Sequence, residues 1–222
     1  MPLKFLPFTA LDIPRGLEIH NRVLHSSQSP VTNLLFNPPA TPESIERQVE
    51  RFTLGPDTFL YKAVENDVTI GYISAKKVSK ISDHSLLVQK GSPSWHESCG
   101  ISRRTWDKCF EMRAEARKES FDFTVDHLQD VHALATDPGY QRRGAGAALL
   151  EKIKAIADEK GLPMYLTSTE TGRKLYERAG FQPMKEIVID LEEMGEVKKG
   201  REMFTVSLAS SPHTGEADKY SI

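Results

Sequence analysis

The chain contains little cysteine and no long apolar segment. Its 222 residues include two cysteines, Cys99 and Cys109. These are too few for a disulfide framework, and their spacing fits no zinc pattern, so no metal site is expected. No apolar run approaches the roughly 18 to 20 residues that cross a bilayer, and the first residues lack the apolar core of a signal peptide. These absences favour a soluble, cytoplasmic protein.

An excess of charge of one sign is also missing. The 29 lysines and arginines nearly balance the 31 acidic residues, which leaves a formal net charge of -2. Such a chain has no general attraction for nucleic acid or for anionic membranes, so neither is expected as a partner. Any cationic site must be local, and the adjacent Arg142 and Arg143 are the obvious candidates.

Hydrophobic patterning indicates one domain that mixes strands and helices. Residues 58–64 and 68–78 are predicted as two strands joined by an Asn-Asp turn, with Gly71 marking a bulge. Residues 79–127 then interrupt the pattern. Their first half is rich in Ser, Gly, Pro and His, and their second half has the periodicity of a helix and many charged residues. We expect a long insertion that contains one helix.

Regular structure resumes after the insertion and ends in two strands, which predicts a mixed sheet with helices packed on it, an α/β or α+β fold. The domain is expected to span 1–210, and the polar residues 211–222 form a disordered tail. The other predicted elements are helices over 11–25 and from Thr41, a strand over 128–136, a helix that Gly161 ends, a strand over 163–168, a helix over 172–180, and strands over 185–191 and 203–209.

The stretch LATDPGYQRRGAGAALLEKI joins a strand to a helix through a turn rich in arginine and glycine. The first N–H groups of a helix have no internal partner and the helix dipole adds positive charge there, so such a turn can bind a phosphate. Gly144 and Gly146 let the backbone approach an anion without a Cβ in the way. Arg142 and Arg143 add charge-assisted hydrogen bonds; the alternative for both is an exposed, solvated turn.

Two common phosphate motifs are excluded. A Walker turn needs Gly-Lys-Ser/Thr, which the chain lacks. A dinucleotide fingerprint needs glycine or alanine three places after its second glycine, where Leu149 stands. The pattern that is left is Gln-x-x-Gly-x-Gly, from Gln141 to Gly146.

That pattern resembles the acetyl-CoA pyrophosphate loop of the GCN5-related N-acetyltransferases, the GNAT family. The likeness extends to GRKLYERAGF, which is similar to a later Tyr-Glu-x-x-Gly-Phe element of the family, and it is specific over residues 128–184. It implies the GNAT acyl-CoA N-acyltransferase fold, a mixed and mostly antiparallel sheet flanked by helices, with a long insertion before the central strand. It also implies acetyl-CoA as cosubstrate.

The resemblance assigns residues to this cofactor. Backbone groups of the strand before the turn would hold the pantetheine arm, and amides of the turn would bind the pyrophosphate. Thr169 and Glu170 stand where family members contact cofactor or substrate, although Glu170 has a solvated loop as its alternative. The implied cofactor-binding residues are Leu134, Ala135, Thr136, Gln141, Arg142, Arg143, Gly144, Ala145, Gly146, Ala147, Thr169 and Tyr176.

Acetyl transfer to an amine requires proton transfers. An aliphatic amine has a pKa near 10.4, so only about one molecule in a thousand is neutral at pH 7. The reaction needs a route for the ammonium proton, donors for the developing oxyanion and an acid for the departing thiolate. Tyr176 stands where the family's tyrosine usually lies, and its phenol would protonate the thiolate. The alternative is a core tyrosine that packs as Leu175 and Phe181 are expected to pack.

Asp130, His132 and Leu134 are expected to alternate on one face of their strand. The run DVHALAT resembles the His-x-His-x-Leu-Ala-Val run of the arylalkylamine N-acetyltransferases, whose two histidines serve proton removal. His132 matches the second histidine and titrates near pH 6.5, so it can accept a proton directly or through water; a structural role is the alternative. Asp130 stands where the family has the first histidine. Three roles are open for it: to orient His132, to attract the ammonium or to face solvent.

These observations together predict an acetyl-CoA-dependent N-acetyltransferase that acetylates a primary amine of a small molecule by direct attack in a ternary complex. A protein lysine or N-terminus as acceptor, or a non-catalytic coenzyme A-binding module, are the alternatives. Cys99 and Cys109 lie away from the motif and are expected to take no part. Trp106, Phe110 and Met112 pack the helix of the insertion or line a substrate pocket.

Overall fold

The computed structural model describes residues 2–27, 29–36, 49, 52, 55–79, 100–121 and 126–209, and for residues 34–36 and 128–132 it describes the backbone alone. Most of the helix predicted from Thr41 lies outside the described residues. So do the first half of the insertion and the predicted tail of 211–222.

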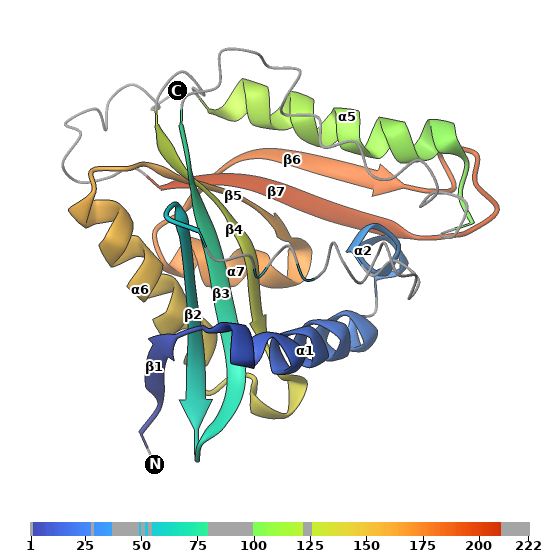
Figure 1. Ribbon diagram of the computed structural model, residues 1–222. Coiled ribbons are helices and arrows are strands. Elements are labelled where there is room, and N and C mark those ends of the chain that lie inside the picture. The colour runs from blue at the N-terminus through green and yellow to red at the C-terminus, as the bar shows by residue number, and fades with distance from the viewer. Residues whose placement is uncertain are drawn as a thin grey trace.

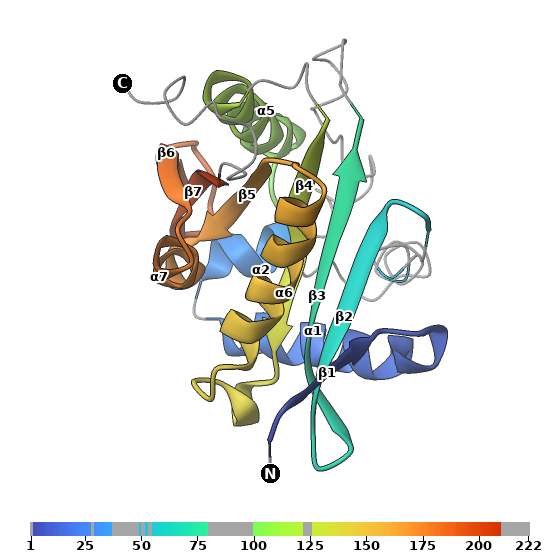
Figure 2. The ribbon, with the colours of Figure 1, turned by 90° about the vertical axis from the view of Figure 1, so that its left-hand side faces the viewer.

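Within the described residues, seven strands form one sheet in the order β1-β2-β3-β4-β5-β7-β6 (Figure 1 and Figure 2). Neighbouring strands are antiparallel except β4 and β5, which run parallel. The predicted mixed and mostly antiparallel sheet is thus confirmed. The strands are β1 (Lys4–Pro7), β2 (Thr58–Glu65), β3 (Val68–Val78), β4 (His127–Thr136), β5 (Met164–Thr169), β6 (Gln182–Asp190) and β7 (Arg201–Ala209).

Helices cover both faces of the sheet (Figure 1). On one face, α6 buries Leu149 and Ile153 in a cluster that α7 also joins. On the other face, α1 packs over Tyr72, and α2 and α5 pack over Phe204. No helix of the described residues is long and apolar enough to cross a membrane. The helices are α1 (Ile13–Ser26), α2 (Pro30–Phe36), α5 (Arg103–Ser120), α6 (Ala145–Glu159) and α7 (Glu170–Arg178), with short 3-10 turns η1 (Ala10–Asp12) and η3 (Pro138–Tyr140).

The β2–β3 hairpin closes through two left-handed residues, Asn66 and Asp67, with φ of 51° and 60°. This conformation gives the tight turn that right-twisted strands prefer. The register between the two strands shifts beside Gly71, so the predicted bulge is confirmed. A Cβ on Gly71 would lie 2.8 Å from the carbonyl oxygen of Ala135. Glycine therefore lets β3 approach β4 closely at the end of the central strand.

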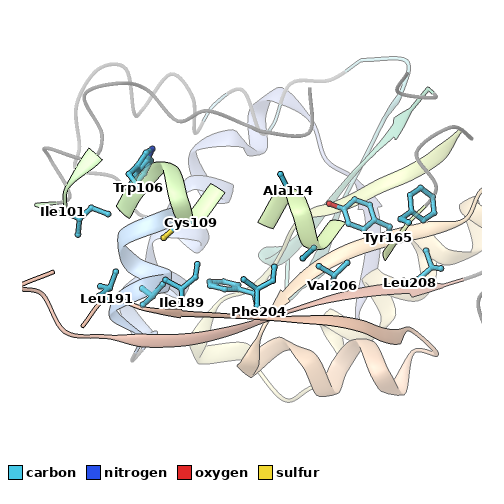
Figure 3. Packing of buried hydrophobic residues seen from close by; sticks show 14 residues of the cluster. Ile101, Trp106, Cys109, Ala114, Tyr165, Ile189, Leu191, Phe204, Val206 and Leu208 are labelled. Carbon is cyan, nitrogen blue, oxygen red and sulfur yellow. The ribbon is translucent and has the colours of Figure 1, made fainter. Parts of the chain in front are cut away.

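Helix α5, in the second half of the predicted insertion, packs onto β6 and β7 (Figure 3). Trp106 is 1% exposed, and its ring centroid lies 5.1 Å from that of Phe110. Both side chains contact an apolar cluster that includes Cys109 and Phe204, and Met112 packs partly against it. Packing, one of the two roles that the sequence left open for this apolar set, is therefore confirmed.

A side-chain network fixes the start of α5. The hydroxyl of Ser102 accepts a hydrogen bond from the backbone N–H of Thr105. Glu196, in the loop between β6 and β7, accepts hydrogen bonds from the N–H and the hydroxyl of Ser102. Hydrogen bonds from the side chains of Ser102 and Thr105 lower the pKa of Glu196. The helix is therefore tied to the final strands at its first turn.

Two short elements were not predicted. β1 has four residues and pairs with β2 at the edge of the sheet. α2 has seven residues. Its first residue, Pro30, lies close to Gly200, since a Cβ built on Gly200 would be 3.0 Å from Cβ of Pro30. Segments this short show no clear hydrophobic period, so they are determined by the elements they pack against.

Candidate functional site

β4 and β5 separate after a short parallel ladder. Within the described strands they pair only at Leu128 and Gln129 of β4, yet β4 runs on to Thr136 and β5 to Thr169. Figure 1 shows the two strands diverging. Because β4 stays paired with β3 as far as Thr136, the side of β4 that faces β5 is the side that loses its partner strand. Backbone groups on this side have no partner from β5, as a ligand that lies along β4 would require.

The backbone groups nearest the end of β4 can be assigned to a side. Asp137 donates its N–H to a carbonyl of β3 at 2.8 Å. Successive strand residues direct their N–H and C=O groups to opposite sides, so those of Thr136 and Leu134 face the gap and those of Ala135 face β3. The carbonyl of Thr136 accepts a hydrogen bond from the side-chain amide of Gln141 (3.1 Å). Leu134 and Thr136 are therefore better placed than Ala135 for the predicted pantetheine contact.

β4 is irregular at the two residues predicted to handle protons. Its register against β3 shifts between Ala133 and Val131, where His132 is the extra residue, and between Val131 and Gln129, where Asp130 is extra. An extra residue locally disturbs the two-residue period of a strand, so the alternation expected of Asp130, His132 and Leu134 stays a prediction. The side chains of Asp130 and His132 lie outside the described residues, and their roles stay predictions.

Two left-handed residues shape the turn before α6. Arg142 has a φ of 62° and Gly144 a φ of 88°. This conformation strains a residue that carries a Cβ, whereas glycine adopts it freely. Gly144 is the N-cap of α6, and among the described residues no atom lies within 4 Å of a Cβ built on it. The backbone conformation, rather than crowding, therefore explains the glycine.

The start of α6 holds backbone amides that the helix itself does not pair. The first helical hydrogen bond runs from the N–H of Ala148 to the carbonyl of Gly144 (3.0 Å). The preceding N–H groups have no acceptor inside the helix, and the helix dipole adds positive charge there. This helix end is therefore suited to an anion. The amides concerned are those of Ala145, Gly146 and Ala147, all three assigned to the pyrophosphate by the resemblance.

The two arginines of the turn differ in their surroundings. Arg143 lies 3.0 Å from the carboxylate of Glu65, donates to the carbonyl of Gly139 at 3.3 Å and stacks over the ring of Tyr140. Its side chain therefore braces the turn against the β2–β3 hairpin. Both side chains are exposed, but that of Arg143 is engaged in these contacts, which makes Arg142 the better candidate of the two for a contact with a phosphate.

Asp137, for which the sequence predicted no role, holds the turn in place through its buried side chain. Its side chain is 0% exposed. One carboxylate oxygen accepts hydrogen bonds or ion pairs from Arg15 (2.7 Å) and Arg22 (3.0 Å), and the other accepts the N–H of Gly139 (3.1 Å). The Asp-Pro-Gly turn is visible in the sequence, but Arg15 lies 122 residues earlier in the chain. No local signal connects the two.

Tyr176 lies on α7, on the same face of the sheet as α6. Its half-buried ring packs against the apolar cluster beneath α6, with its centroid 5.9 Å from that of Phe181. Phe181 is 1% exposed and Leu175 is partly buried in the same cluster, which confirms the packing expected of both. The predicted acid and the predicted pyrophosphate turn are therefore on one side of the protein.

The first turn of α7 is capped from another strand. Thr169 is the N-cap residue but makes no side-chain capping hydrogen bond. Glu202 of β7, only 6% exposed, accepts the N–H of Glu170 instead (3.2 Å). The side chain of Glu170 is exposed. Glu202 is thus a second buried carboxylate near the site that sequence reasoning missed.

Cys109 is buried beneath α5, with 1% of its surface exposed. Burial raises the pKa of its thiol to about 11, although the charge of Arg113 acts in the opposite direction. A protonated, buried thiol is a poor nucleophile, which agrees with the expectation that Cys109 takes no part in the chemistry. Cys99 lies outside the described residues.

Sequence and structure comparisons agree with this geometry. Residues 112–183 match the sequence model of the acetyltransferase (GNAT) domain. This match includes the end of α5, β4, the turn, α6, β5 and α7. No curated protein sequence matches the chain.

Solved structures of N-acetyltransferases share the fold over nearly the whole chain. Arylalkylamine N-acetyltransferase 2 from Aedes aegypti has a TM-score of 0.67 at 15% identity, over 95% of this chain and 99% of its own. The ribosomal-protein-S18-alanine N-acetyltransferase from Escherichia coli has a TM-score of 0.54 at 15% identity, over 97% and 98%. NAA60 from Arabidopsis thaliana, solved with acetyl-CoA, has a TM-score of 0.55 at 17% identity, over 94% and 99%.

At these identities the structural similarity establishes the fold, while the domain match rests on the sequence itself. Both point to the family that the motifs resemble, and the predicted resemblance is confirmed. Residues 112–183 have the sequence pattern of an acetyltransferase (GNAT) domain, and the chain has the fold of the solved GNAT N-acetyltransferases.

Proposed function

We propose that the chain is an acetyl-CoA-dependent N-acetyltransferase whose acceptor is a primary amine of a small molecule. The observation that carries the proposal is the gap between β4 and β5, which ends beside the amide-rich start of α6. A pantetheine arm along Leu134 and Thr136 would place the thioester in the gap, with the pyrophosphate on the turn of residues 141–147. The similarity to an arylalkylamine N-acetyltransferase supports a small amine as acceptor.

The proposed reaction is a direct attack in a ternary complex. The neutral amine nitrogen bonds to the thioester carbonyl carbon, and an N–H of β4 stabilises the oxyanion that forms. The carbon–sulfur bond then breaks, which leaves the N-protonated amide and the coenzyme A thiolate. The nitrogen loses its proton to His132, directly or through water, with Asp130 as a candidate for orienting that base. Tyr176 gives its proton to the thiolate.

The activity is tested by the release of free thiol from acetyl-CoA in the presence of arylalkylamines, polyamines and amino sugars. Turnover with one of these amines is the expected result. Turnover only with peptides that offer a lysine or a free N-terminus would replace the small amine by a protein acceptor, in line with the similarity to the S18-alanine enzyme. Coenzyme A binding without turnover on any acceptor would show a non-catalytic binding module.

Tyr176→Phe tests the proposed acid. Removing the phenol proton donor should lower the turnover rate by about a hundredfold, within the range typical of general acid catalysis, and leave the affinity for acetyl-CoA nearly unchanged. Tyr61→Phe is the matched control, because Tyr61 lies on β2, which β3 and β4 separate from the gap beside β5. Undiminished turnover of Tyr176→Phe would exclude Tyr176 as the acid.

His132→Gln tests the proposed base through the pH dependence of the rate. If His132 accepts the amine proton, the rate of the unchanged enzyme falls on the acid side of a midpoint near pH 6.5, where imidazole becomes protonated. That limb should disappear in the glutamine variant, and the rate at pH 8 should fall by about 10²- to 10⁴-fold. A variant that keeps both the limb and the rate would contradict the assignment.

A further inference from the structure

A network of four charged side chains joins α1 to the turn before α6. Arg15 and Arg22 both contact the carboxylate of Asp137, at 2.7 Å and 3.0 Å. Glu18 lies 2.7 Å from Arg15 and 3.8 Å from Arg22 on the same helix. Asp137 is fully buried, whereas Arg22 and Glu18 are about half exposed. The network therefore runs from the surface of α1 to a buried point at the end of β4.

Asp137 acts on the turn through its backbone as well as its side chain. Its carboxylate accepts the N–H of Gly139 at 3.1 Å, and its carbonyl accepts the N–H of Tyr140 at 2.8 Å. Its own N–H bonds to Ile70 of β3. The η3 turn that leads into residues 141–147 is thus shaped around this one residue. A buried carboxylate keeps such a position only while its cationic partners hold it.

The two arginines reach this point from the far side of the sheet. α1 packs on the face that carries Tyr72 and Ala135, and α6 packs on the opposite face with Ile73 and Leu134. The Nε of Arg15 also donates to the carbonyl of Thr69. α1 is therefore fastened both to the β2–β3 hairpin and to the turn.

We propose that Asp137 is a positioning residue for coenzyme A, and that Arg15 and Arg22 set the affinity for this cofactor from the opposite face of the sheet. The inference rests on the proposed function in one respect, that the turn binds the pyrophosphate. Arg22 offers the sharpest test, because within the described residues it pairs with Asp137 and Glu18 and it lies on α1 rather than in the turn.

The experiment measures the affinity for coenzyme A itself by isothermal titration calorimetry, so that neither an amine nor turnover is needed. Arg22→Gln should weaken binding by about three- to thirtyfold, as changes within a coupled network do, with a small change of thermal midpoint in the absence of ligand, because Arg15 still pairs with Asp137. Arg22→Lys, which keeps the charge, should recover most of the affinity. Arg103→Gln, which breaks a similarly exposed i,i+4 pair with Asp107 on α5, should bind like the unchanged chain.

Asp137→Asn should weaken coenzyme A binding further than Arg22→Gln does. If Asp137→Asn does not fold, the Arg22 variants alone test the inference. Unchanged affinity in Arg22→Gln would overturn the inference while leaving the proposed function standing. Equal losses in Arg22→Gln and Arg103→Gln would also overturn it, because the effect would then be general. If the unchanged chain binds no coenzyme A, the proposed function fails and this inference fails with it.

Discussion

Two glycines at the start of α6 meet different physical requirements. Gly144 has a φ of 88°, where any other residue is strained. Gly146 has an ordinary environment, because a Cβ there would lie 3.5 Å from Oγ1 of Thr136 and 3.7 Å from Cδ2 of Leu175. These are normal van der Waals distances, so the protein itself accepts a methyl group at position 146. A ligand that approaches the backbone closely is what would exclude it.

Alanine substitutions separate these two requirements. Gly144→Ala should lower the free energy of unfolding by about 1 to 2 kcal/mol through backbone strain. Gly146→Ala should leave it unchanged or raise it by up to about 1 kcal/mol, because alanine favours helix. Both should weaken coenzyme A binding, measured by calorimetry beside urea denaturation. Full affinity in Gly146→Ala would mean that the ligand does not approach this residue.

At the scale of elements, Asp12 joins the start of α1 to β2. One carboxylate oxygen accepts from Nζ of Lys62 at 2.6 Å, and the other accepts from the N–H and the hydroxyl of Thr9. Burial by itself raises the pKa of Asp12, but the hydrogen bonds from Lys62 and Thr9 outweigh it, and the pKa lies below its ordinary value. The carboxylate is therefore bound more favourably in the folded protein than in the unfolded chain.

This shift fixes the sign of a pH dependence. A lowered folded pKa contributes stability that is fully present above the unfolded value of about 3.9 and is lost as the pH falls through the folded value. Asp12→Asn should cost about 1 to 3 kcal/mol at pH 7, and the difference from the unchanged protein should shrink between pH 5 and pH 2. Urea denaturation at several pH values measures it. A difference that is constant with pH would contradict the ionic role.

At the scale of the whole molecule, α5 belongs to the core. Its Trp106 and Cys109 are buried against β6 and β7, with Ile189 and Phe204 in the same cluster (Figure 3). Glu196 ties the first turn of the helix to the loop between those strands. The second half of the predicted insertion is therefore part of what stabilises the C-terminal strands, even though it lies far from them in the chain.

Trp106→Ala tests this integration. Removing a fully buried indole should lower the free energy of unfolding by about 3 to 5 kcal/mol, within a single cooperative transition. Lys108→Ala, on the exposed side of the same helix, should change it by less than about 0.5 kcal/mol. A small effect of Trp106→Ala, or a separate early transition, would show that α5 folds independently of the sheet.

The resemblance to the GNAT family associated the turn before α6 with the Tyr176 segment, whereas local signals in the sequence were sufficient for the hairpin of β2 and β3 and for α6 with its glycine-rich start. Each depends on neighbouring residues: φ preferences of Asn, Asp and Gly, a helical period, and the unpaired amides of a helix start. These are enough to predict the fold class and the place of a phosphate.

Only the tertiary structure decided the rest. β1 and α2 are too short to show a period, and the extra residues in β4 become visible only when the strand is paired with β3. The gap beside β4 exists because β5 pairs with β7 over its whole length while leaving β4 after two residue pairs. Asp137 finds its arginines on α1, and Glu202 caps α7 from β7. The physical reason is common to all of these features: they depend on contacts between residues far apart in the chain, which a local pattern does not encode.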